Sequence, residues 1–367
     1  MGTPSRQERH ANSSTWSASG PINLELAPKN YAITRLGIEV RLSITTTLQT
    51  LFSDYYDRAV TNLSLSGMGR NFFNFTNMRA AAHFNRLRGC GMGRPTVIAD
   101  SQTTLVQHIY YLFHFGVKPT LNGEDNPFDL TGGIPPVASG NLTLQGTWGA
   151  AAAMSTNCTI AAGSMHVYLW GVVGGQPIML PEWSMATPTP TATSSAFATA
   201  YNIPSGNFLR SLLVMETNGT NAPRDDSVLN SIKLYNSKEG QTLLAYGGQA
   251  GAVADYKAAE AFQQFSARAR YVPPSENVTT AMTGVLTGGS PGVPDITHAI
   301  DSGLVPIYLY QFQGAHPQYG IDLQKNAAGD YQLQWGVSDA TGVTVDVVHE
   351  KYAPNAAHPM GAALLRR

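Results

Sequence analysis

The sequence repeats itself once on the scale of a domain, and this repeat limits the possible folds more than any other feature does. Two segments have a helical pattern: Met78–Arg88 (MRAAAHFNRLR) in the first half and Tyr256–Arg270 (YKAAEAFQQFSARAR) in the second. In each, alanine and large apolar residues recur at positions i, i+4 and i+7, which lie on one face of a helix. Both segments have Ala-Ala in the first turn and apolar residues at the same later positions.

Five blocks of strand-like sequence recur around these two helices in the same order. They pair Leu63–Leu65 with Ile232–Leu234, Tyr111–Phe115 with Tyr308–Phe312, Phe128–Leu130 with Ile321–Leu323, Leu142–Gln145 with Tyr331–Gln334, and Met165–Leu169 with Val343–Val347. Together with the helix, these collinear blocks favour two copies of one domain in tandem. The alternative is that two unrelated β domains happen to share a similar spacing of strands.

Strand-like patterns dominate both halves. Ile33–Thr47 alternates apolar and polar residues, which predicts a strand with one buried face. Further strands are predicted at Leu63–Leu65, His108–Val117, Leu142–Trp148, Met165–Val173, Phe208–Thr217, Ile232–Tyr235, Ile307–Phe312, Tyr331–Val337 and Val343–Val348. Their aromatic residues, such as those of Tyr110–Phe113, are expected in the core. Many short strands with very few helices favour a sandwich or a barrel over βαβ units.

The two halves meet at Pro181–Ser205, a segment rich in proline, threonine, serine and alanine that is typical of an extended connection. An immunoglobulin sandwich is shorter and has a Cys…Trp…Cys spacing that this chain lacks, and propeller blades are shorter still. A jelly roll fits best, so the sequence predicts an all-β protein of two tandem eight-stranded jelly rolls, each with a short helix in a loop. The predicted segments are a polar N-terminal arm at 1–30, the first jelly roll at 31–183, a Pro/Thr-rich linker at 184–205, the second jelly roll at 206–352 and a C-terminal tail at 353–367.

The chain carries unusually few charges for its size. Charged residues make up 13% of the sequence, and the formal net charge is −1, whereas soluble domains usually contain about 25% charged residues. A balanced charge excludes a polycation that condenses nucleic acid by neutralising phosphates. Because scattered charge keeps monomers apart, a surface with so little of it favours association with further copies of the chain.

The cysteine content and the hydropathy of the chain exclude further classes of protein. Cys90 and Cys158 are the only cysteines, so neither a disulfide framework nor a zinc site can be built from them. Met1–Gly20 is polar and does not resemble a secretory signal, and no window of 18 apolar residues occurs. These features predict a soluble protein that is made in a cytoplasm.

Three glycine-containing motifs suggest chemistry that their context does not support. Gly288–Gly292 matches the G-x-S-x-G pattern of serine hydrolases, but Pro291 follows the serine and no strand-to-helix turn is expected there. Gly67–Gly69 and Gly89–Gly93 lack the remaining residues of a phosphate-binding loop, and the second follows a helix, where a C-cap is expected.

Titratable residues form no recognisable catalytic or metal-binding set. The pair His349-Glu350 has no second histidine at metal-binding spacing, and His108 and His114 are expected on one half-exposed strand face. Acid pairs at Glu124-Asp125 and Asp225-Asp226 are expected in solvated turns. Cys90 lies near Arg88 and Arg94, which would lower its pKa, but no histidine or acid is placed to assist it. We therefore expect no catalytic, cofactor-binding or metal-binding residues.

At the level of architecture, the chain resembles the double jelly-roll major capsid proteins of tailless icosahedral viruses with an internal membrane, in particular their phage members. The resemblance covers about Tyr31–Tyr352 and rests on the two repeats, a helix in each, the Pro/Thr linker, and Asn202–Val214, which looks like the opening strand of such a domain. It implies trimers with a pseudo-sixfold outline that tile a shell.

The resemblance implies a structural role without catalysis or cofactors. The expected partners are the chain itself in trimers and neighbouring capsomers, penton and minor capsid proteins, and an internal membrane reached through the termini, with no sequence-specific nucleic-acid binding. Met1–Gly20 is a candidate arm, and Leu364–Arg367 a candidate basic tail. The expected location is the virion, after synthesis and assembly in a host cytoplasm. Two alternatives stay open: a tandem β-sandwich that binds carbohydrate, and a viral receptor-binding spike.

Overall fold

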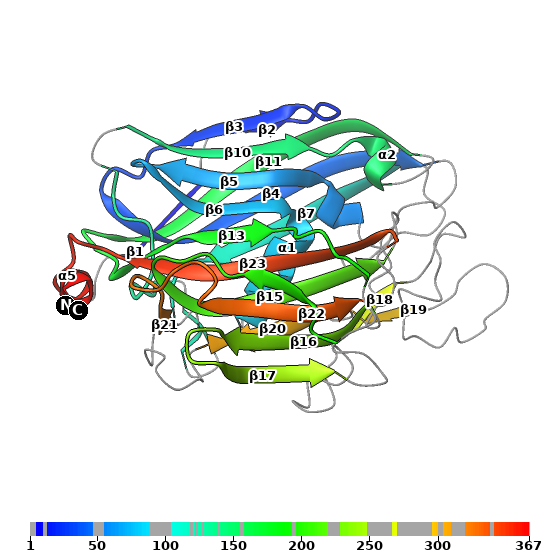
Figure 1. The fold of residues 1–367 in the computed structure, drawn as a ribbon. Helices are drawn as coiled ribbons and strands as arrows, with labels where there is room; N and C mark the ends of the chain where they lie inside the picture. The colour runs from blue at the N-terminus through cyan, green and yellow to red at the C-terminus, as the bar shows by residue number, and fades with distance from the viewer. Residues whose placement is uncertain are drawn as a thin grey trace. The chain divides into compact units, whose positions relative to one another are not determined.

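The structure is a computed structural model that describes most of the chain. The described residues are 5–9, 13–46, 55–88, 104–117, 120–121, 124–126, 128–137, 140–154, 158–192, 196–218, 228–247, 266–269, 296–299, 304–309, 320–337 and 341–366. Strands form most of this part, which confirms the predicted all-β class (Figure 1). None of the helices in the described ranges is long and apolar enough to cross a membrane.

The chain divides into two compact units. Unit 1 comprises Met1–Ser184 together with Glu350–Arg367, and unit 2 comprises Met185–His349. The last residues of the chain therefore belong with the first half. The boundaries predicted for the two jelly rolls, the linker and the tail stay predictions.

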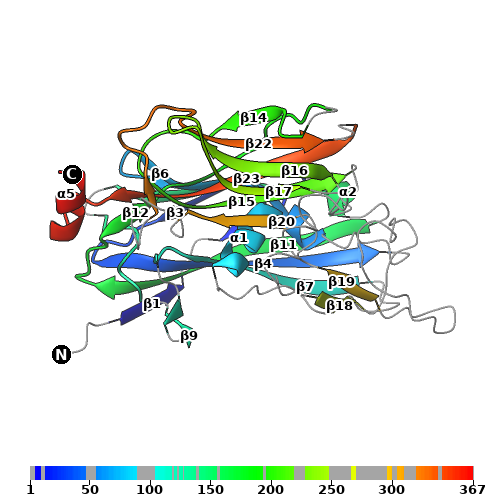
Figure 2. The same ribbon diagram turned by 60° about the horizontal axis from the view of Figure 1, so that its bottom comes forward.

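One sheet of unit 1 has the strand order β1 (Ser5–Arg9), β11 (Cys158–Val173), β4 (Tyr31–Thr46) and β7 (Thr104–His114), and the short β2 (Ser14–Thr15) also pairs with β11. All its pairings are antiparallel, and Figure 2 shows β4 running between β11 and β7. Along β4 the even-numbered residues from Leu36 to Ile44 are buried. The alternation in the sequence is therefore the alternation between the two faces of this sheet.

A second sheet of unit 1 has the strand order β3 (Pro21–Leu26), β10 (Leu142–Trp148), β5 (Val60–Gly67), β6 (Arg70–Asn77) and β13 (Trp183–Ala186). The strand β12 (Met179–Pro181) pairs with the end of β23 (Val343–Pro354). Residues 1–30, predicted to be a polar arm, thus contribute strands: alternate residues of β3 are buried, and β3 pairs with β10 over its whole length.

Helix α1 (Met78–Leu87) lies where the sequence predicts it. It begins after Asn77, whose side-chain oxygen accepts a hydrogen bond from the Ala80 backbone N–H at 2.8 Å and so caps the first turn. Phe84 packs from α1 into an aromatic core, with its ring 5.1 Å from that of Trp183 in an edge-on arrangement. Phe73 stacks on Phe113 at 4.7 Å in the same core.

Shorter elements complete unit 1. They are a 3-10 helix at Tyr55–Arg58, α2 (Ala151–Met154), the hairpin of β8 (Thr120–Leu121) and β9 (Glu124–Asp125), and α5 (Pro359–Leu365). The side chain of His358 caps α5 by accepting a hydrogen bond from the Met360 backbone N–H. The predicted tail at 353–367 therefore contains a helix.

Unit 2 contains the four-stranded antiparallel sheet β14 (Thr199–Asn202), β22 (Tyr331–Val337), β16 (Leu229–Asn236) and β17 (Gln241–Gly247). Its strand β15 (Phe208–Asn218) pairs with β20 (Leu304–Tyr308) and β21 (Ile321–Asp322), and β15 lies next to β23 in the sheet order. Between these strands lies an apolar core that includes Trp335, Leu333 and Val347.

Most predicted strands are confirmed, but the second helix is not. Within the predicted helix Tyr256–Arg270, Ser266–Ala269 form strand β18, which pairs with β19 (Ile296–Ala299); the other residues of that prediction lie outside the described ranges. Pairing between strands here overrides a local helical pattern, which is a weak determinant without tertiary support. Of the strand predicted at Ile307–Phe312, only the start is in β20, and residues 310–312 lie outside the described ranges.

Candidate interaction face

The face of β4, β7 and β11 that points away from the core carries a concentrated set of polar and aromatic side chains. The register places Tyr110 of β7 and His166 of β11 on either side of Glu39, and His108 and Ser164 on either side of Arg41. Residues opposite one another in such a sheet share a face and lie within contact distance. We call this surface the Glu39 face, and it consists of Arg35, Glu39, Arg41, Val106, His108, Tyr110, Tyr168 and Trp170.

Glu39 is the centre of this face because four neighbouring side chains reach its carboxylate. Arg41 donates through Nε and Nη2, each at 3.0 Å, and the Tyr168 hydroxyl donates at 2.8 Å. His108 Nδ1 lies 3.0 Å from Oε1, and the Tyr110 hydroxyl donates to Oε1 at 3.4 Å. The Glu39 side chain is only 5% exposed, whereas those of Arg41 and His108 are 41% and 43% exposed.

This arrangement fixes the charge of Glu39. Burial by itself would raise the pKa of the carboxyl, but the hydrogen bonds from Arg41, His108 and Tyr168 outweigh it and lower the pKa to about 2. The same carboxylate raises the pKa of the Arg41 guanidinium through their hydrogen bond. The pKa of Tyr110 is raised by partial burial and by the negative charge of Glu39. The centre of the face is therefore an ionised, fully hydrogen-bonded group with aromatic rings beside it.

At one end of the face the Trp170 ring contacts both a guanidinium group and the sheet backbone. The Arg35 guanidinium carbon lies 4.7 Å from the centre of the Trp170 ring, within the range of a cation–π contact. The indole packs over Gly37, where an added Cβ would come within 2.9 Å of the ring. A glycine at this position lets the tryptophan cover the backbone. Tyr168 continues the aromatic surface, with its ring 6.3 Å from that of Trp170.

Two large apolar side chains of β7 complete the face and are exposed. Val106 is 61% exposed and Tyr110 is 47% exposed. The sequence alone places Tyr110 in the core, and this is wrong, because the residue falls on the outward side of the pleat while Tyr111 falls on the inward side. Tyrosine, tryptophan and arginine are the residues most enriched at the centres of protein–protein interfaces. The Glu39 face has the composition of a contact surface.

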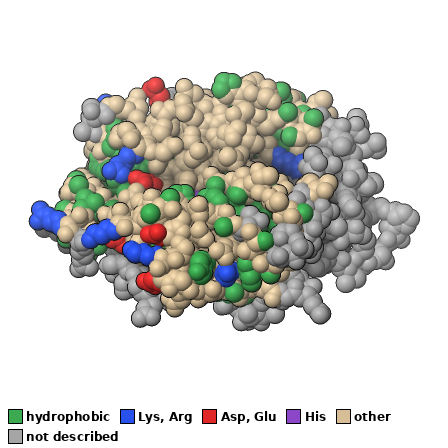
Figure 3. All heavy atoms as spheres, viewed as in Figure 1, with side chains coloured by type: hydrophobic (Ala, Val, Ile, Leu, Met, Phe, Trp, Pro, Cys, Tyr) green, Lys and Arg blue, Asp and Glu red, His purple; other side chains and the backbone are tan. Residues whose placement is uncertain are grey.

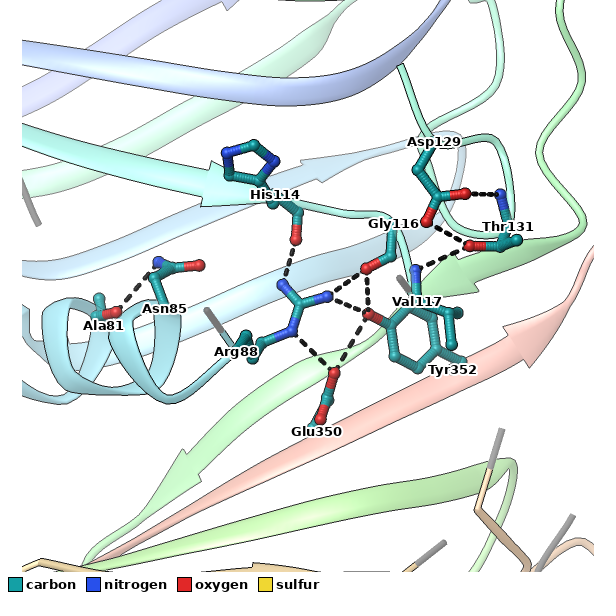
Figure 4. Close-up of polar contacts among 10 residues, drawn as sticks. All are labelled: Ala81, Asn85, Arg88, His114, Gly116, Val117, Asp129, Thr131, Glu350 and Tyr352. Atoms are coloured by element: carbon teal, nitrogen blue, oxygen red, sulfur yellow. Dashed lines mark hydrogen bonds and ion pairs between the residues drawn. The ribbon is translucent and has the colours of Figure 1, made fainter. Parts of the chain in front are cut away.

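A second polar cluster, shown in Figure 4, is buried and holds unit 1 together. Arg88, just after α1, forms an ion pair with Glu350 at 2.9 Å and donates to the Tyr352 hydroxyl at 2.8 Å. The same guanidinium also donates to the backbone carbonyls of His114 and Gly116 at the end of β7. The side chains of Arg88 and Glu350 are 4% and 3% exposed. This cluster fastens Glu350–Pro354 to α1 and β7, so we assign it a structural role.

Of the three glycine motifs, the structure describes Gly67–Gly69, which forms a turn. Gly67 ends β5 and pairs with Arg70 of β6, and the two residues between them, Met68 and Gly69, have φ of +52° and +71°. This is a tight two-residue hairpin with positive φ at both central positions. Gly89–Gly93, Cys90, Asp225-Asp226 and Gly288–Gly292 lie outside the described residues.

The strand register places His108 and His114 on the same side of β7, as their even spacing predicts, but only His108 is exposed. His108 lies on the Glu39 face, whereas His114 is 1% exposed. Burial and the nearby charges of Arg35 and Arg88 lower the pKa of His114 to about 3, so the ring is neutral. Nowhere in the described ranges do three or more His, Cys, Asp or Glu side chains gather as a metal site would need.

The remaining titratable motifs are used within the fold. In unit 2, His349 Nε2 lies 3.0 Å from the Tyr201 hydroxyl. In unit 1, Glu350 is the partner of Arg88. The sequence predicts Glu124 and Asp125 in a turn, and this is wrong, because they form the short strand β9, which pairs with β8. The prediction that the chain has no catalytic, cofactor-binding or metal-binding residues stays a prediction.

Comparison with known proteins finds similarity in structure and none in sequence. No family model and no curated protein sequence matches the chain. The crystal structure of the major capsid protein of Sulfolobus turreted icosahedral virus is similar with a TM-score of 0.66 at 12% identity, over 95% of this chain and 96% of that one.

Two further major capsid proteins are similar along nearly their whole length. Protein P2 of bacteriophage PM2 has a TM-score of 0.54 at 9% identity, over 95% of this chain and 97% of that one. The capsid of the virus PBCV-1 gives a TM-score of 0.56 at 11% identity, over 96% and 94% of the two chains. The resemblance noted in the sequence is therefore confirmed at the level of structure: this chain has the double jelly-roll fold of viral major capsid proteins.

Proposed function

We propose that this chain is a structural major capsid protein that forms trimeric, pseudo-hexameric capsomers of an icosahedral virus shell and has no catalytic activity. The observation that carries the proposal is the similarity in fold to several viral major capsid proteins over 94% or more of both chains. A similarity of this extent leaves little of the chain for an added catalytic domain. Fold alone does not specify function, so the proposal also needs a surface that suits assembly.

The architecture is physically suited to tiling. Two similar β units in each chain give a trimer six similar edges, which can take the place of a hexamer in a closed shell. The chain has 13% charged residues and a net charge of −1, so its surface opposes close packing between copies only weakly. Obligate interfaces are large and more apolar than ordinary surface.

We propose the Glu39 face as a contact surface between copies. Val106 and Tyr110 would supply apolar area that is exposed in the isolated chain, and the Glu39 carboxylate is already neutralised by its neighbours. The Glu39 carboxylate is only 5% exposed and already hydrogen-bonded, so covering the face removes little further water from it, whereas the Arg41 guanidinium would lose part of its hydration. Preorganised tyrosine and tryptophan rings also lose little conformational freedom on binding.

The experiment is sedimentation velocity on the wild-type chain and on Val106→Asp. We expect the wild type to sediment as a trimer or a larger assembly, and Val106→Asp to dissociate into folded monomers, because a carboxylate would be buried without a partner at the interface. Met68→Asp, at a 44% exposed apolar residue in the β5–β6 turn, is the matched control and should assemble normally. A Val106→Asp variant that assembles like the wild type removes the Glu39 face from the interface, and a monomeric wild type contradicts the capsid function.

The proposal extends to location and partners. The chain would reside in the virion after synthesis and assembly in the host cytoplasm. It would contact neighbouring capsomers, penton or vertex proteins and minor capsid proteins. The terminal segments 1–30 and 353–367 are the proposed points of contact with an internal membrane. No sequence-specific contact with nucleic acid is proposed, because the net charge of −1 gives no excess of cations.

A further inference from the structure

The outward face of the sheet β14-β22-β16-β17 in unit 2 carries side-chain amides in place of the charges of the Glu39 face. The register aligns Asn202, Gln332 and Tyr235 in one row across three strands, and Ala200, Gln334 and Lys233 in the next row. The alternate residues of the same strands, such as Leu333 and Trp335, are buried in the core. We call the outward set of Phe197, Asn202, Lys233, Tyr235, Gln332 and Gln334 the amide face.

The three amides form a directional chain of hydrogen bonds. Gln334 Nε2 donates to Gln332 Oε1 at 2.9 Å, and Gln332 Nε2 donates to Asn202 Oδ1 at 3.1 Å. The chain ends with the Asn202 amide nitrogen on one side and the Gln334 amide oxygen on the other. Within the described part of the chain neither end has a hydrogen-bond partner, so donors and acceptors remain for another molecule.

A lysine stands between two aromatic rings beside this chain of amides. Lys233 Nζ lies 5.0 Å from the centre of the Phe197 ring and 5.0 Å from that of Tyr235. No carboxylate among the described residues pairs with it. The rings hold the ammonium group in place without neutralising it, so the amide face presents one fixed positive charge.

Phe197 is held in this position against its own backbone preference. Its φ is +57°, a region that bulky side chains rarely occupy, and its N–H donates to the Ser231 hydroxyl at 3.1 Å. Backbone strain of this kind costs about 1–3 kcal/mol and tends to occur at binding sites. The strain places the Phe197 ring beside Lys233, which also lies next to the Tyr235 ring. Figure 3 shows that the side chains over β22 and β16 are mainly uncharged.

From these features we infer that the amide face binds an oligosaccharide that carries a carboxylate. Sugar hydroxyls are paired donors and acceptors, and they match the open ends of the amide chain. The apolar face of a sugar ring can lie against Tyr235 or Phe197, and a carboxylate can pair with Lys233 through charge-assisted hydrogen bonds.

The same features argue against other ligand classes. Nucleic acid needs a stripe of basic residues, and the amide face has one lysine. A phosphate group is usually held by arginine forks or by backbone N–H groups at a helix N-terminus, and the amide face has neither. An extended peptide would bind to a strand edge through its backbone rather than to the middle of the sheet. The inference goes beyond the proposed shell function and does not depend on it.

The test is binding of the purified full-length chain to immobilised sialylated, uronate-containing and neutral oligosaccharides, followed by titration of the best glycan. We expect retention on carboxylated glycans and not on their neutral counterparts. Lys233→Met and Gln332→Ala should each weaken binding about tenfold or more, as expected when a charge-assisted or cooperative hydrogen bond is lost. Unfolding curves of these variants should match the wild type.

Two matched controls separate the amide face from general surface effects. Lys238→Met removes the same charge from the exposed turn between β16 and β17, and Gln241→Ala removes an amide from the exposed start of β17. Both should bind like the wild type. The inference is overturned if no carboxylated glycan is retained, if neutral glycans bind equally well, or if Lys233→Met binds as tightly as Lys238→Met. Sedimentation velocity of the same sample tests the proposed shell function independently of glycan binding.

Discussion

At the scale of single residues, the ion pair between Arg88 and Glu350 joins positions that are 262 residues apart in the chain. Both side chains are almost completely buried. Removing one partner from such a pair leaves an uncompensated charge in the interior, which costs about 3–5 kcal/mol. We expect Glu350→Gln to lower the free energy of unfolding of unit 1 by about this amount, as measured by urea denaturation.

The same chain offers a matched control for this prediction. Arg70 and Glu182 form an ion pair of nearly the same length, 3.0 Å, but their side chains are 44% and 27% exposed. Glu182→Gln should therefore cost less than about 1 kcal/mol. Equal losses in Glu350→Gln and Glu182→Gln would show that burial does not set the strength of these pairs.

Phe84 is the residue through which α1 is anchored in the aromatic core. It is 2% exposed and its ring contacts those of Phe75 and Trp183. Phe84→Ala should lower the free energy of unfolding by about 3–5 kcal/mol, because it removes buried apolar area and leaves a cavity. Phe128→Ala, at a phenylalanine that is 37% exposed, is the control and should cost far less. If Phe84→Ala is as stable as the wild type in urea, α1 is not anchored in this way.

The lowered pKa of His114 predicts that the free energy of unfolding depends on pH. Its pKa is about 3 in the folded chain, against 6.5 ordinarily. Between these values the unfolded chain takes up a proton and the folded chain does not, so stability decreases as the pH falls, by at most about 1.4 kcal/mol per pH unit. The pKa of about 2 for Glu39 adds a further loss, but only as the pH falls below about 4.5.

The contribution of His114 is therefore measurable between pH 6.5 and 4.5. We expect the free energy of unfolding of His114→Gln to change less over this interval than that of the wild type. His358→Asn, at the N-cap of α5, controls for the loss of an imidazole and keeps a capping side chain. An unchanged pH profile in His114→Gln would show that the ring is not held neutral by its surroundings.

These residue-level clusters could not be predicted from the sequence. Glu39, Arg41 and His108 fall on the polar positions of alternating strands, and such positions usually face solvent. Only strand register places Tyr168 of β11 and His108 of β7 on either side of β4. Arg88 could be read as a helix end beside Cys90, but its partner Glu350 is distant in sequence. Nothing local indicates that pairing.

At the scale of elements, the periodicity of apolar residues predicted those strands and the helix whose apolar faces pack into the core. The strand β10 and the strand β22 have the predicted bounds, and α1 differs by one residue, because each has one apolar face and a clear turn or cap at its ends. The strand β1 is short and polar, so its sequence has no pattern that predicts a strand. It forms a strand because it pairs with β11. The helix predicted at Tyr256–Arg270 is wrong at Ser266–Ala269, where pairing with β19 prevails.

The β5–β6 hairpin gives a prediction at this scale. Met68 has positive φ, which costs a non-glycine residue about 1–2 kcal/mol, whereas asparagine tolerates this conformation. Met68→Asn should therefore raise the free energy of unfolding by about 0.5–1 kcal/mol in urea denaturation. Gly69→Ala should lower it by about 1 kcal/mol, because φ there is +71° and the added methyl contacts nothing. A less stable Met68→Asn variant or a more stable Gly69→Ala variant would contradict the assigned turn.

At the scale of the whole molecule, the repeat in the sequence predicted two β domains, and the fold shared with viral major capsid proteins agrees with that reading. The sequence did not show that Glu350–Arg367 return to unit 1. That return depends on the buried pairing of Arg88 with Glu350 and on the pairing of β12 with the end of β23. Both are long-range contacts without a local signature.

The proposed function requires copies of this chain to assemble with one another into trimers. The most direct test is the mass of the purified full-length chain in solution, measured by light scattering after size exclusion. The chain has a mass of 39.3 kDa, and we predict a species of three times that mass or a much larger particle. A chain that remains a 39.3 kDa monomer at high protein concentration would contradict the claim.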